Sequence, residues 1–185
     1  IFKEKLYFSS DGFLEVFDEG SRGMLTLRGK FNNEFKKAVT NSTGVNFPDR
    51  CKIEIKKERS LAWMSVDELL FSFAEEEISD MKNKISDAFR NFNALIADVS
   101  AARVVFCLSG TRVREVIAKL APVDIAPDRF NINEFRRTRF GQISAAFWFV
   151  SGEKVRVMCS RSYSEYMFSL LCRASENGSE VGLWD

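Results

Sequence analysis

Apolar and polar residues alternate along two short stretches near the start of the chain, which is the period of a strand with one exposed face. Residues 24–28 read Met-Leu-Thr-Leu-Arg, and residues 51–57 read Cys-Lys-Ile-Glu-Ile-Lys-Lys. Residues 60–64 are more continuously apolar and favour a buried strand. Further strand-like runs lie at residues 95–99, 103–108, 143–150 and 154–159. The last two are joined at Ser151-Gly152, so we expect a hairpin there.

Apolar residues recur at helical spacing in other segments, and residues that cap helices mark several of the starts. These segments are residues 32–43, 65–73, 78–92, 111–120 and 162–176. Asn32 is the predicted cap of the first helix, and Gly44 lies where it should end. Ser-x-x-Glu patterns, the spacing of a capping box, begin the second helix at Ser65 and the last at Ser162.

This order of elements favours an α+β fold with mixed or antiparallel sheets and packed helices over a doubly wound parallel sheet, because several strands pair locally. We expect an N-terminal arm over residues 1–23 and a single domain over residues 24–185, with residues 24–93 and 94–176 as candidate sub-lobes. The elements between residues 95 and 176 are expected to pack as one lobe around buried apolar side chains. These are Val113, Val116, Ile117, Met167, Leu170 and Leu171.

The N-terminal arm is rich in apolar side chains but shows neither a helical stripe nor sustained alternation. These side chains are Ile1, Phe2, Leu6, Tyr7, Phe8, Phe13, Leu14 and Phe17. The whole chain has 18 Phe among 185 residues, and the cores of protein interfaces favour aromatic side chains. We therefore expect the arm to anchor this chain to another one. The alternative is that the arm folds back over its own domain.

Composition excludes several classes of function. The formal net charge is +1, so no global basic field attracts nucleic acid or an anionic membrane, and no stretch approaches the roughly 20 apolar residues of a membrane span. The cysteines form no CxxC motif and are expected to be reduced thiols in a cytoplasmic protein. They are Cys51, Cys107, Cys159 and Cys172. The chain contains no histidine, which removes the commonest general base and metal ligand.

Four groups of residues carry candidate chemistry, each with a simpler structural explanation. Ser-Gly-Thr at 109–111 precedes a predicted helix, where amides bind anions, but it lacks the pattern of a phosphate loop. Arg-Arg-Thr-Arg-Phe at 136–140 suits a phosphate or an exposed strand edge. The glutamates at 75–77 suit a helix N-terminus better than a metal ion, and Tyr163 and Tyr166 are expected in a core stripe. We predict no catalytic, cofactor-binding or metal site in this chain.

An ordered series of segments between about residue 24 and residue 176 resembles the gamma subunits of heterotetrameric sarcosine oxidase. The segments are residues 24–30, 33–43, 44–48, 61–70, 97–100, 108–110, 116–124 and 161–166, with Arg103 and Arg112 among them. The chain keeps the family's Asp67 and Glu68 but has Ser65-Val66 where the family often has Gly-Pro. The shared order of these segments makes the resemblance specific.

That family is similar in turn to the folate-binding aminomethyltransferase, or T-protein, so the resemblance implies a T-protein-like fold. T-proteins carry an acidic pair on a late strand that follows a glycine pair, and residues 141–146 fall at this place. Here the acidic positions are occupied by Ala145 and Ala146. Methyl groups neither orient nor deprotonate a folate amine, so this departure puts folate chemistry in this chain in doubt.

The resemblance implies a non-catalytic structural subunit of a complex that oxidatively demethylates sarcosine to glycine. Alpha-, beta- and delta-type subunits would be its partners, and they would hold FAD, FMN, NAD, tetrahydrofolate and zinc, with none of these in this chain. N-methylglutamate dehydrogenases use similar subunits, so the amine substrate stays open. A divergent folate-binding aminomethyltransferase-like enzyme and a nucleic-acid-binding module are the alternative functions.

Overall fold

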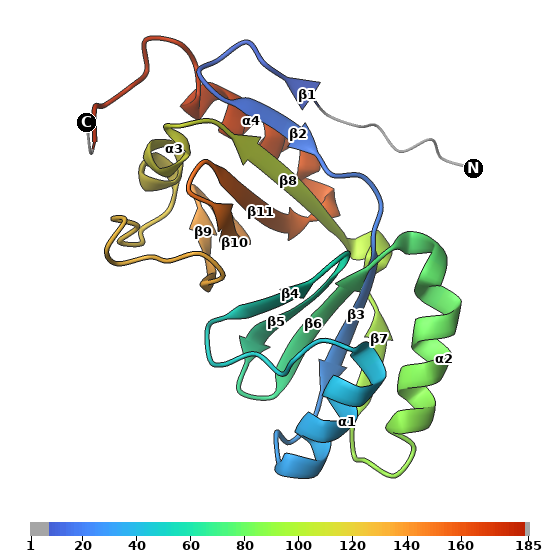
Figure 1. Ribbon diagram of the computed structural model, residues 1–185. Helices are drawn as coiled ribbons and strands as arrows, with labels where there is room; N and C mark the ends of the chain where they lie inside the picture. Colours follow the sequence, from blue (N-terminus) through green and yellow to red (C-terminus); the bar gives the residue numbers. More distant parts are fainter. Residues whose placement is uncertain (1–7, 184–185) are drawn as a thin grey trace. The chain divides into compact units, whose positions relative to one another are not determined.

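The computed structural model describes residues 8–183, and the chain falls into two units (Figure 1). One unit, here called the terminal unit, comprises the chain up to Gly20 and from Ala102 onward. The other, here called the inserted unit, comprises Ser21–Ala101. Each unit has its own antiparallel sheet and its own helices, so two distant parts of the sequence fold together in the terminal unit.

The terminal unit is built on an antiparallel sheet of six described strands in the order β1-β2-β8-β11-β10-β9. The strands are β1 (Phe8–Ser9), β2 (Glu15–Asp18), β8 (Arg103–Ser109), β9 (Phe135–Phe140), β10 (Ile143–Ser151) and β11 (Lys154–Ser160). The helices are α3 (Val113–Leu120), the 3-10 turn η3 (Arg161–Tyr163) and α4 (Ser164–Ala174). Helices α3 and α4 pack against one face of this sheet (Figure 1).

The core between this sheet and its helices is rich in phenylalanine. The fully buried aromatic side chains are Phe106, Phe130, Phe140, Phe147 and Phe149. Each contributes about 1.5–3 kcal/mol relative to exposure. The predicted stripe on α3 and α4 is confirmed at Val113, Val116, Ile117, Met167 and Leu171. Leu170 is only partly buried at the margin of the same core, so the prediction was too strong at that residue.

The inserted unit is built on an antiparallel sheet of five described strands in the order β4-β5-β6-β3-β7. The strands are β3 (Gly23–Arg28), β4 (Ile53–Lys56), β5 (Arg59–Ser65), β6 (Glu68–Phe73) and β7 (Leu95–Asp98). The helical segments are α1 (Asn33–Thr43), η1 (Glu75–Glu77), α2 (Ile78–Ala88) and η2 (Ser100–Ala102), which leads out of the unit. Helices α1 and α2 pack with the apolar face of the sheet to form this unit's core.

Helix α1 begins and ends where its cap residues predict. The side-chain oxygen of Asn32 accepts a hydrogen bond from the Phe35 amide at 2.8 Å. Gly44 has a φ of 74°, and its amide donates to the Thr40 carbonyl. A left-handed residue at this position satisfies a terminal carbonyl and is easiest for glycine. The buried face of the helix includes Phe35 and Val39.

The predicted helix at residues 65–73 is wrong, because this segment forms the turn after β5 and then strand β6. The Ser65 hydroxyl donates to the Asp67 carboxylate at 2.6 Å and so closes a turn rather than capping a helix. Strand β6 lies between β5 and β3, and its apolar side chains are buried on both faces of the sheet. A short run of continuous apolar residues fits a central strand and a buried helix equally well. The period of this segment therefore does not distinguish a strand from a helix.

The strands at residues 95–98 and 103–109 do not share a lobe, which corrects the expectation that both pack with the C-terminal helices. Strand β7 pairs with β3 in the inserted unit, with Leu25 opposite Asp98. Strand β8 pairs with β2 and β11 in the terminal unit. Val99 and the 3-10 turn η2 separate them, and this short link is where the chain passes from one unit to the other.

The N-terminal segment is part of its own unit over the residues that the structure describes. Strand β2 pairs with β8, and Leu14 and Val16 are 3% and 0% exposed in the core. Residues 14–18 thus fold back over their own unit, as the alternative predicts, and the expected anchoring to another chain stays a prediction. The arm residues Ile1, Phe2, Leu6 and Tyr7 lie outside the described residues.

Candidate functional site

The Ser-Gly-Thr sequence before α3 serves packing in this structure. The Gly110 φ is 152°, and a side chain there would lie 2.4 Å from a methyl group of Leu14. Its amide donates to the Glu153 carbonyl at 2.9 Å. Glycine is therefore required by the close approach of the N-terminal segment. No side chain caps the first turn of α3, which begins at Val113.

The three glutamates form the 3-10 turn η1, and one of them is engaged in an ion pair. Glu77 pairs with Arg59, whose guanidinium also donates to the Thr43 carbonyl at 3.2 Å. The pair joins β5 to the start of α2 and to the end of α1. Within residues 8–183, no three His, Cys, Asp or Glu side chains are grouped in a way that suits a metal ion.

The basic run at 136–140 lies on β9, an edge strand of the sheet in the terminal unit. This agrees with the simpler interpretation of the run as an exposed strand edge. The Arg136 guanidinium lies 5.8 Å from the centre of the Phe130 ring. Arg137 and Arg139 are exposed on the alternate face of the strand. Strands β10 and β11 separate β9 from β8, so the structure does not bring these arginines together with Ser109.

Ala145 and Ala146 lie in β10, inside the sheet, between β9 and β11. They are 8% and 3% exposed. Their Cα partners on β11 are Cys159 and Met158. Their Cα partners on β9 are Thr138 and Arg137. A buried methyl group offers neither a hydrogen-bond acceptor nor a proton acceptor at either position.

Tyr163 and Tyr166 are 48% and 49% exposed, so the prediction that they belong to the core stripe is wrong. The reason is the 3-10 turn η3, which ends at Tyr163. Because a 3-10 turn has a different number of residues per turn, it shifts which side chains face the core before α4 begins. From that start, Met167 and Leu171, four residues apart, face the core.

The four cysteines are free thiols. Burial raises the pKa of Cys107 to about 11 and that of Cys159 to about 12. Burial also raises the pKa of Cys172, which is half-buried. Because the thiolate is the nucleophile, these three side chains are poorly suited to nucleophilic chemistry near neutral pH.

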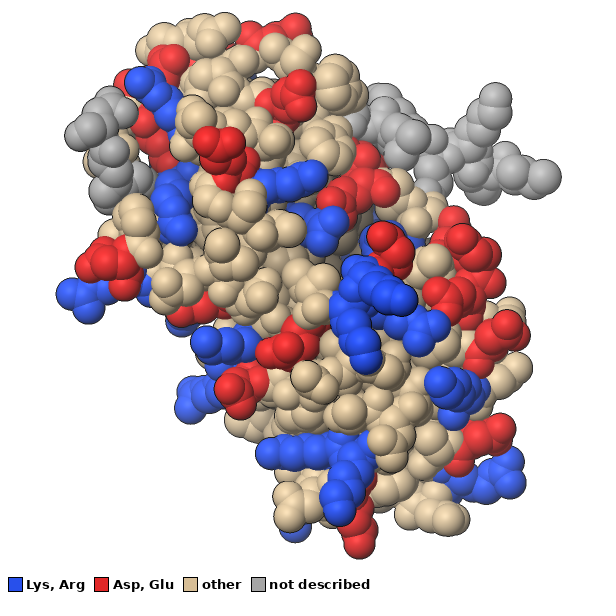
Figure 2. All heavy atoms as spheres, in the orientation of Figure 1, with Lys and Arg blue, Asp and Glu red and all other residues tan. Residues whose placement is uncertain are grey.

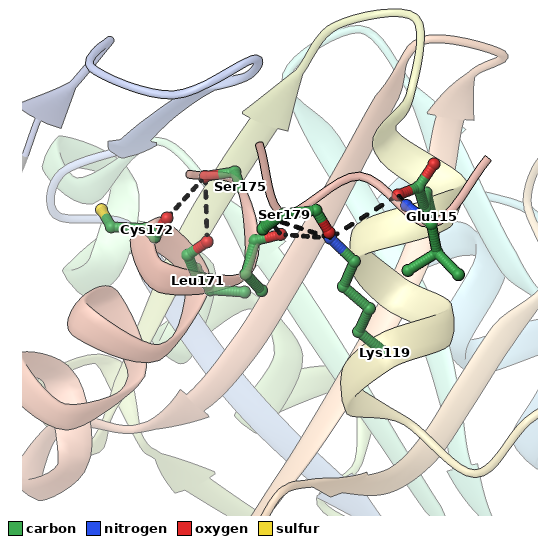
Figure 3. Close-up of polar contacts among 8 residues, drawn as sticks. Glu115, Lys119, Leu171, Cys172, Ser175 and Ser179 are labelled. Atoms are coloured by element: carbon green, nitrogen blue, oxygen red, sulfur yellow. Dashed lines mark hydrogen bonds and ion pairs between the residues drawn. The ribbon is translucent and has the colours of Figure 1, made fainter. Parts of the chain in front are cut away.

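A buried ion pair that the sequence pattern did not single out joins α3 to the C-terminal segment (Figure 3). Glu115 is 2% exposed, and its Oε1 lies 3.6 Å from Lys119 Nζ. The same oxygen accepts a hydrogen bond from the Val181 amide. Lys119 Nζ donates to the carbonyls of Ala174 and Ser179 at 3.0 and 2.6 Å (Figure 3). Ala174 is the last residue of α4, where a cation is favourable.

The surroundings of Glu115 keep it ionised. Burial raises the pKa of this carboxyl, but the hydrogen bond from the Val181 amide and the charge of Lys119 outweigh that effect, so its pKa is lower than usual. A carboxylate stabilised in this way is a weak proton acceptor, so the pair acts as a clamp on the C-terminal segment. The four-residue spacing of Glu115 and Lys119 in the sequence indicates that they can form an ion pair. It does not show that the pair is buried, because such pairs commonly lie on exposed helix faces.

Two adjoining depressions on the inserted unit share Phe31. One has a volume of about 670 Å³, and its lining includes Arg28, Lys30, Phe31, Val66, Asp67 and Leu95. The other has a volume of about 330 Å³, and its lining includes Phe31, Lys36, Phe47, Asp49, Arg50 and Trp63. We call the two together the aromatic groove. It is a shallow surface feature and not an enclosed cavity, so it suits an extended ligand better than a small buried one.

On the face shown in Figure 2, Lys and Arg side chains are interspersed with Asp and Glu, and neither sign covers the surface. On this face the mixture does not form the basic stripe typical of nucleic-acid-binding proteins. Within residues 8–183, no helix is both long and apolar enough to cross a membrane.

Comparison with known proteins gives consistent matches. The model of the sarcosine oxidase, gamma subunit family matches residues 28–177. Sarcosine oxidase subunit gamma of Corynebacterium sp. strain U-96 is 26% identical over 132 residues, which are 70% of this chain and 63% of that protein. The matched region thus spans less than two thirds of the length of this curated relative.

Two solved structures share the fold. A chain of the heterotetrameric sarcosine oxidase from Corynebacterium sp. U-96, in complex with pyrrole 2-carboxylate, superposes with a TM-score of 0.82 and 21% identity, covering 90% of this chain and 86% of that one. Aminomethyltransferase T of the glycine cleavage system from Bartonella henselae gives a TM-score of 0.64 and 8% identity, covering 91% and 48%. These likenesses confirm the predicted T-protein-like α+β fold. Because the family model matches most of the sequence, the chain belongs to the sarcosine oxidase, gamma subunit family.

Proposed function

We propose that this chain is a non-catalytic assembly subunit of a heterotetrameric sarcosine oxidase, which oxidatively demethylates sarcosine to glycine. The observation that carries the proposal is membership of the gamma subunit family in a chain with buried Ala145 and Ala146, which fall where the resemblance places the acidic pair of T-proteins. The lack of histidine and the raised pKa values of Cys107 and Cys159 support it, because the commonest general base is absent and these two thiols are poor nucleophiles near neutral pH.

The proposal assigns the chemistry to the partners. Alpha-, beta- and delta-type subunits hold FAD, FMN, NAD, tetrahydrofolate and zinc, and the complex works in the cytoplasm. This chain contributes protein surface, and each of its two units is built on an antiparallel sheet. The T-protein-like fold supports a role as a scaffold that retains the shape of a folate-binding domain but not its acidic pair.

Co-expression with the chain's genomic neighbours tests this function. We expect a stable complex of fixed stoichiometry that has a flavin absorption band and oxidises sarcosine. The purified chain alone should be colourless and inactive. The neighbours expressed without this chain are the control, and they should keep their flavin but assemble incompletely. A yellow isolated chain, or sarcosine oxidation by it, would show that the non-catalytic assignment is wrong.

Two alternatives have direct tests. The fold likeness to aminomethyltransferase T favours a folate-binding enzyme as the second candidate. Calorimetric titration of the isolated chain with tetrahydrofolate should give no binding heat, whereas saturable binding would favour that candidate. The amine substrate is tested on the complex, by comparing oxidation of sarcosine with oxidation of N-methylglutamate.

A further inference from the structure

The aromatic groove lies at one end of the inserted unit, where several loops converge. Strand β3 ends there and leads into α1, the turn between β5 and β6 flanks it, and the loop after α2 leads into β7 (Figure 1). These backbone segments are held by sheet pairing on one side of the groove and by helix caps on the other. The surface is therefore preformed.

The groove exposes apolar side chains on a shared surface. Val66 is 76% exposed and Leu95 is 55% exposed, and both line the larger depression. In the smaller depression, Phe31 and Phe47 make an edge-to-face contact with their ring centres 5.0 Å apart. A single exposed apolar residue needs no explanation. Exposed aliphatic side chains beside half-buried aromatic rings on one surface are typical of a protein contact.

The charges around the groove are unbalanced. The cationic side chains of its lining are Arg28, Lys30, Lys36 and Arg50, and the acidic ones are Asp49 and Asp67. Asp67 is already hydrogen-bonded to Arg28 at 3.2 Å and to Ser65. The lining thus has a surplus of two positive charges, more than the +1 of the whole chain. Such a rim is complementary to carboxylates.

Two of these cations sit above aromatic rings. Lys36 Nζ lies 5.2 Å from the centre of the Phe47 ring, and the Arg50 guanidinium lies 5.9 Å from that of Trp63. These cation–π contacts hold the charges at the rim of an apolar floor. An acidic side chain can reach the rim while its apolar neighbour occupies the floor.

We propose that the aromatic groove docks an acidic segment of another subunit, in which carboxylates alternate with apolar side chains. The inference rests on the assembly function proposed above and names the surface that performs it. A polypeptide segment fits better than a small molecule, because the depressions are open and extended and the apolar and cationic groups are spread along them.

Substitutions in the assembled complex test the surface, each with a matched control. Val66→Asp is compared with Ile132→Asp, since Ile132 is a 50% exposed residue of the terminal unit. Arg50→Glu is compared with Lys84→Glu on α2, since both side chains are exposed. We expect the groove variants to bind the co-expressed subunits at least about tenfold more weakly, with the controls within about twofold of wild type. Thermal unfolding of each variant checks that it is folded.

Carbodiimide cross-linking of the wild-type complex tests the chemistry of the occupant. This reagent joins a lysine amine directly to a carboxylate in contact with it. We expect cross-links from Lys30 and Lys36 to Asp or Glu of one other subunit, and none from Lys84.

Normal assembly by the groove variants, or no cross-link from either groove lysine, would overturn the docking proposal while leaving the assembly function intact. Cross-links to a second copy of this chain, with loss of a dimer in Val66→Asp, would assign the groove to self-association and overturn it as well. A wild-type chain that forms no complex with its neighbours would refute both proposals.

Discussion

Removing the charge of Glu115 should weaken the clamp on the C-terminal segment measurably. Glu115→Gln keeps the size of the side chain and an oxygen for the Val181 amide, but it leaves Lys119 without its counterion. Hydrogen bonds that involve a charged group contribute about 1.5–3 kcal/mol. The Lys119 side chain is 18% exposed and retains the carbonyls of Ala174 and Ser179, so the full cost of a broken buried pair should not be reached. We expect a loss of about 2–3 kcal/mol in the free energy of unfolding near pH 7.

The effect of this substitution should depend on pH in a defined direction. The pKa of Glu115 is lowered by folding from an ordinary value of 4.5, so its ionised form stabilises the folded chain above that pH. As the pH falls below 4.5 toward the lowered pKa, the carboxylate becomes protonated in the folded state too, and wild type loses its advantage over Glu115→Gln.

Urea unfolding at neutral and acidic pH, followed by circular dichroism, measures this difference. Glu153→Gln, an exposed position in the turn between β10 and β11, is the control and should unfold like wild type at both pH values. An equal stability of Glu115→Gln and wild type at pH 7 would refute the argument. So would a stability difference that stays constant between pH 7 and acidic pH.

Three further outcomes follow from packing and burial. Leu171→Ala removes a 0% exposed side chain and should cost about 2–5 kcal/mol in urea unfolding, with a smaller cost for the partly buried Leu170→Ala. Gly110→Ala places a methyl group 2.4 Å from a buried leucine and should lower stability by about 1–3 kcal/mol in the same assay. Cys107 and Cys159, with pKa values of about 11 and about 12, should resist an aromatic disulfide reagent at pH 8 until the chain unfolds, and rapid labelling of the native protein would contradict this.

The N-terminal segment shows how non-local pairing overrides a weak local pattern. Its apolar residues lack a clear period, which made a detached arm a reasonable prediction. In the structure, Leu14 and Val16 complete the core of the terminal unit, and the Phe13 amide donates to the Ser175 carbonyl at 2.8 Å. Removal of this stretch should therefore destabilise the unit itself. An assembly defect after such a truncation would not identify an interface.

The candidate chemistry was judged from the sequence with mixed success. The basic run at 136–140 lies on an edge strand, and Ala145 and Ala146 are consecutive buried residues of an inner strand. Glu115 was missed because a helical Glu–Lys pair carries the same spacing whether it is exposed or covered. Only the C-terminal segment, which returns to α3 through the Val181 amide, makes that pair buried.

The sequence by itself determined the elements whose cause is local. Helix α1 is specified by its Asn32 cap and terminal Gly44, and helices α3 and α4 by apolar residues at helical spacing. The hairpin of β10 and β11 follows from two apolar runs joined by a short turn. The ordered segments that resemble the gamma subunit family are also visible without coordinates.

Tertiary structure decided everything that depends on which segments meet. Strand β6 is a strand because β3 and β5 flank it, and β7 and β8 separate because each finds its partner in a different sheet. The aromatic groove gathers residues far apart in the sequence, with Phe31 from the loop before α1, Trp63 from β5 and Leu95 from the start of β7. The hydrophobic period of a segment shows which face of a helix or strand is apolar. Which strand or helix packs against that face is determined by contacts between residues distant in the sequence.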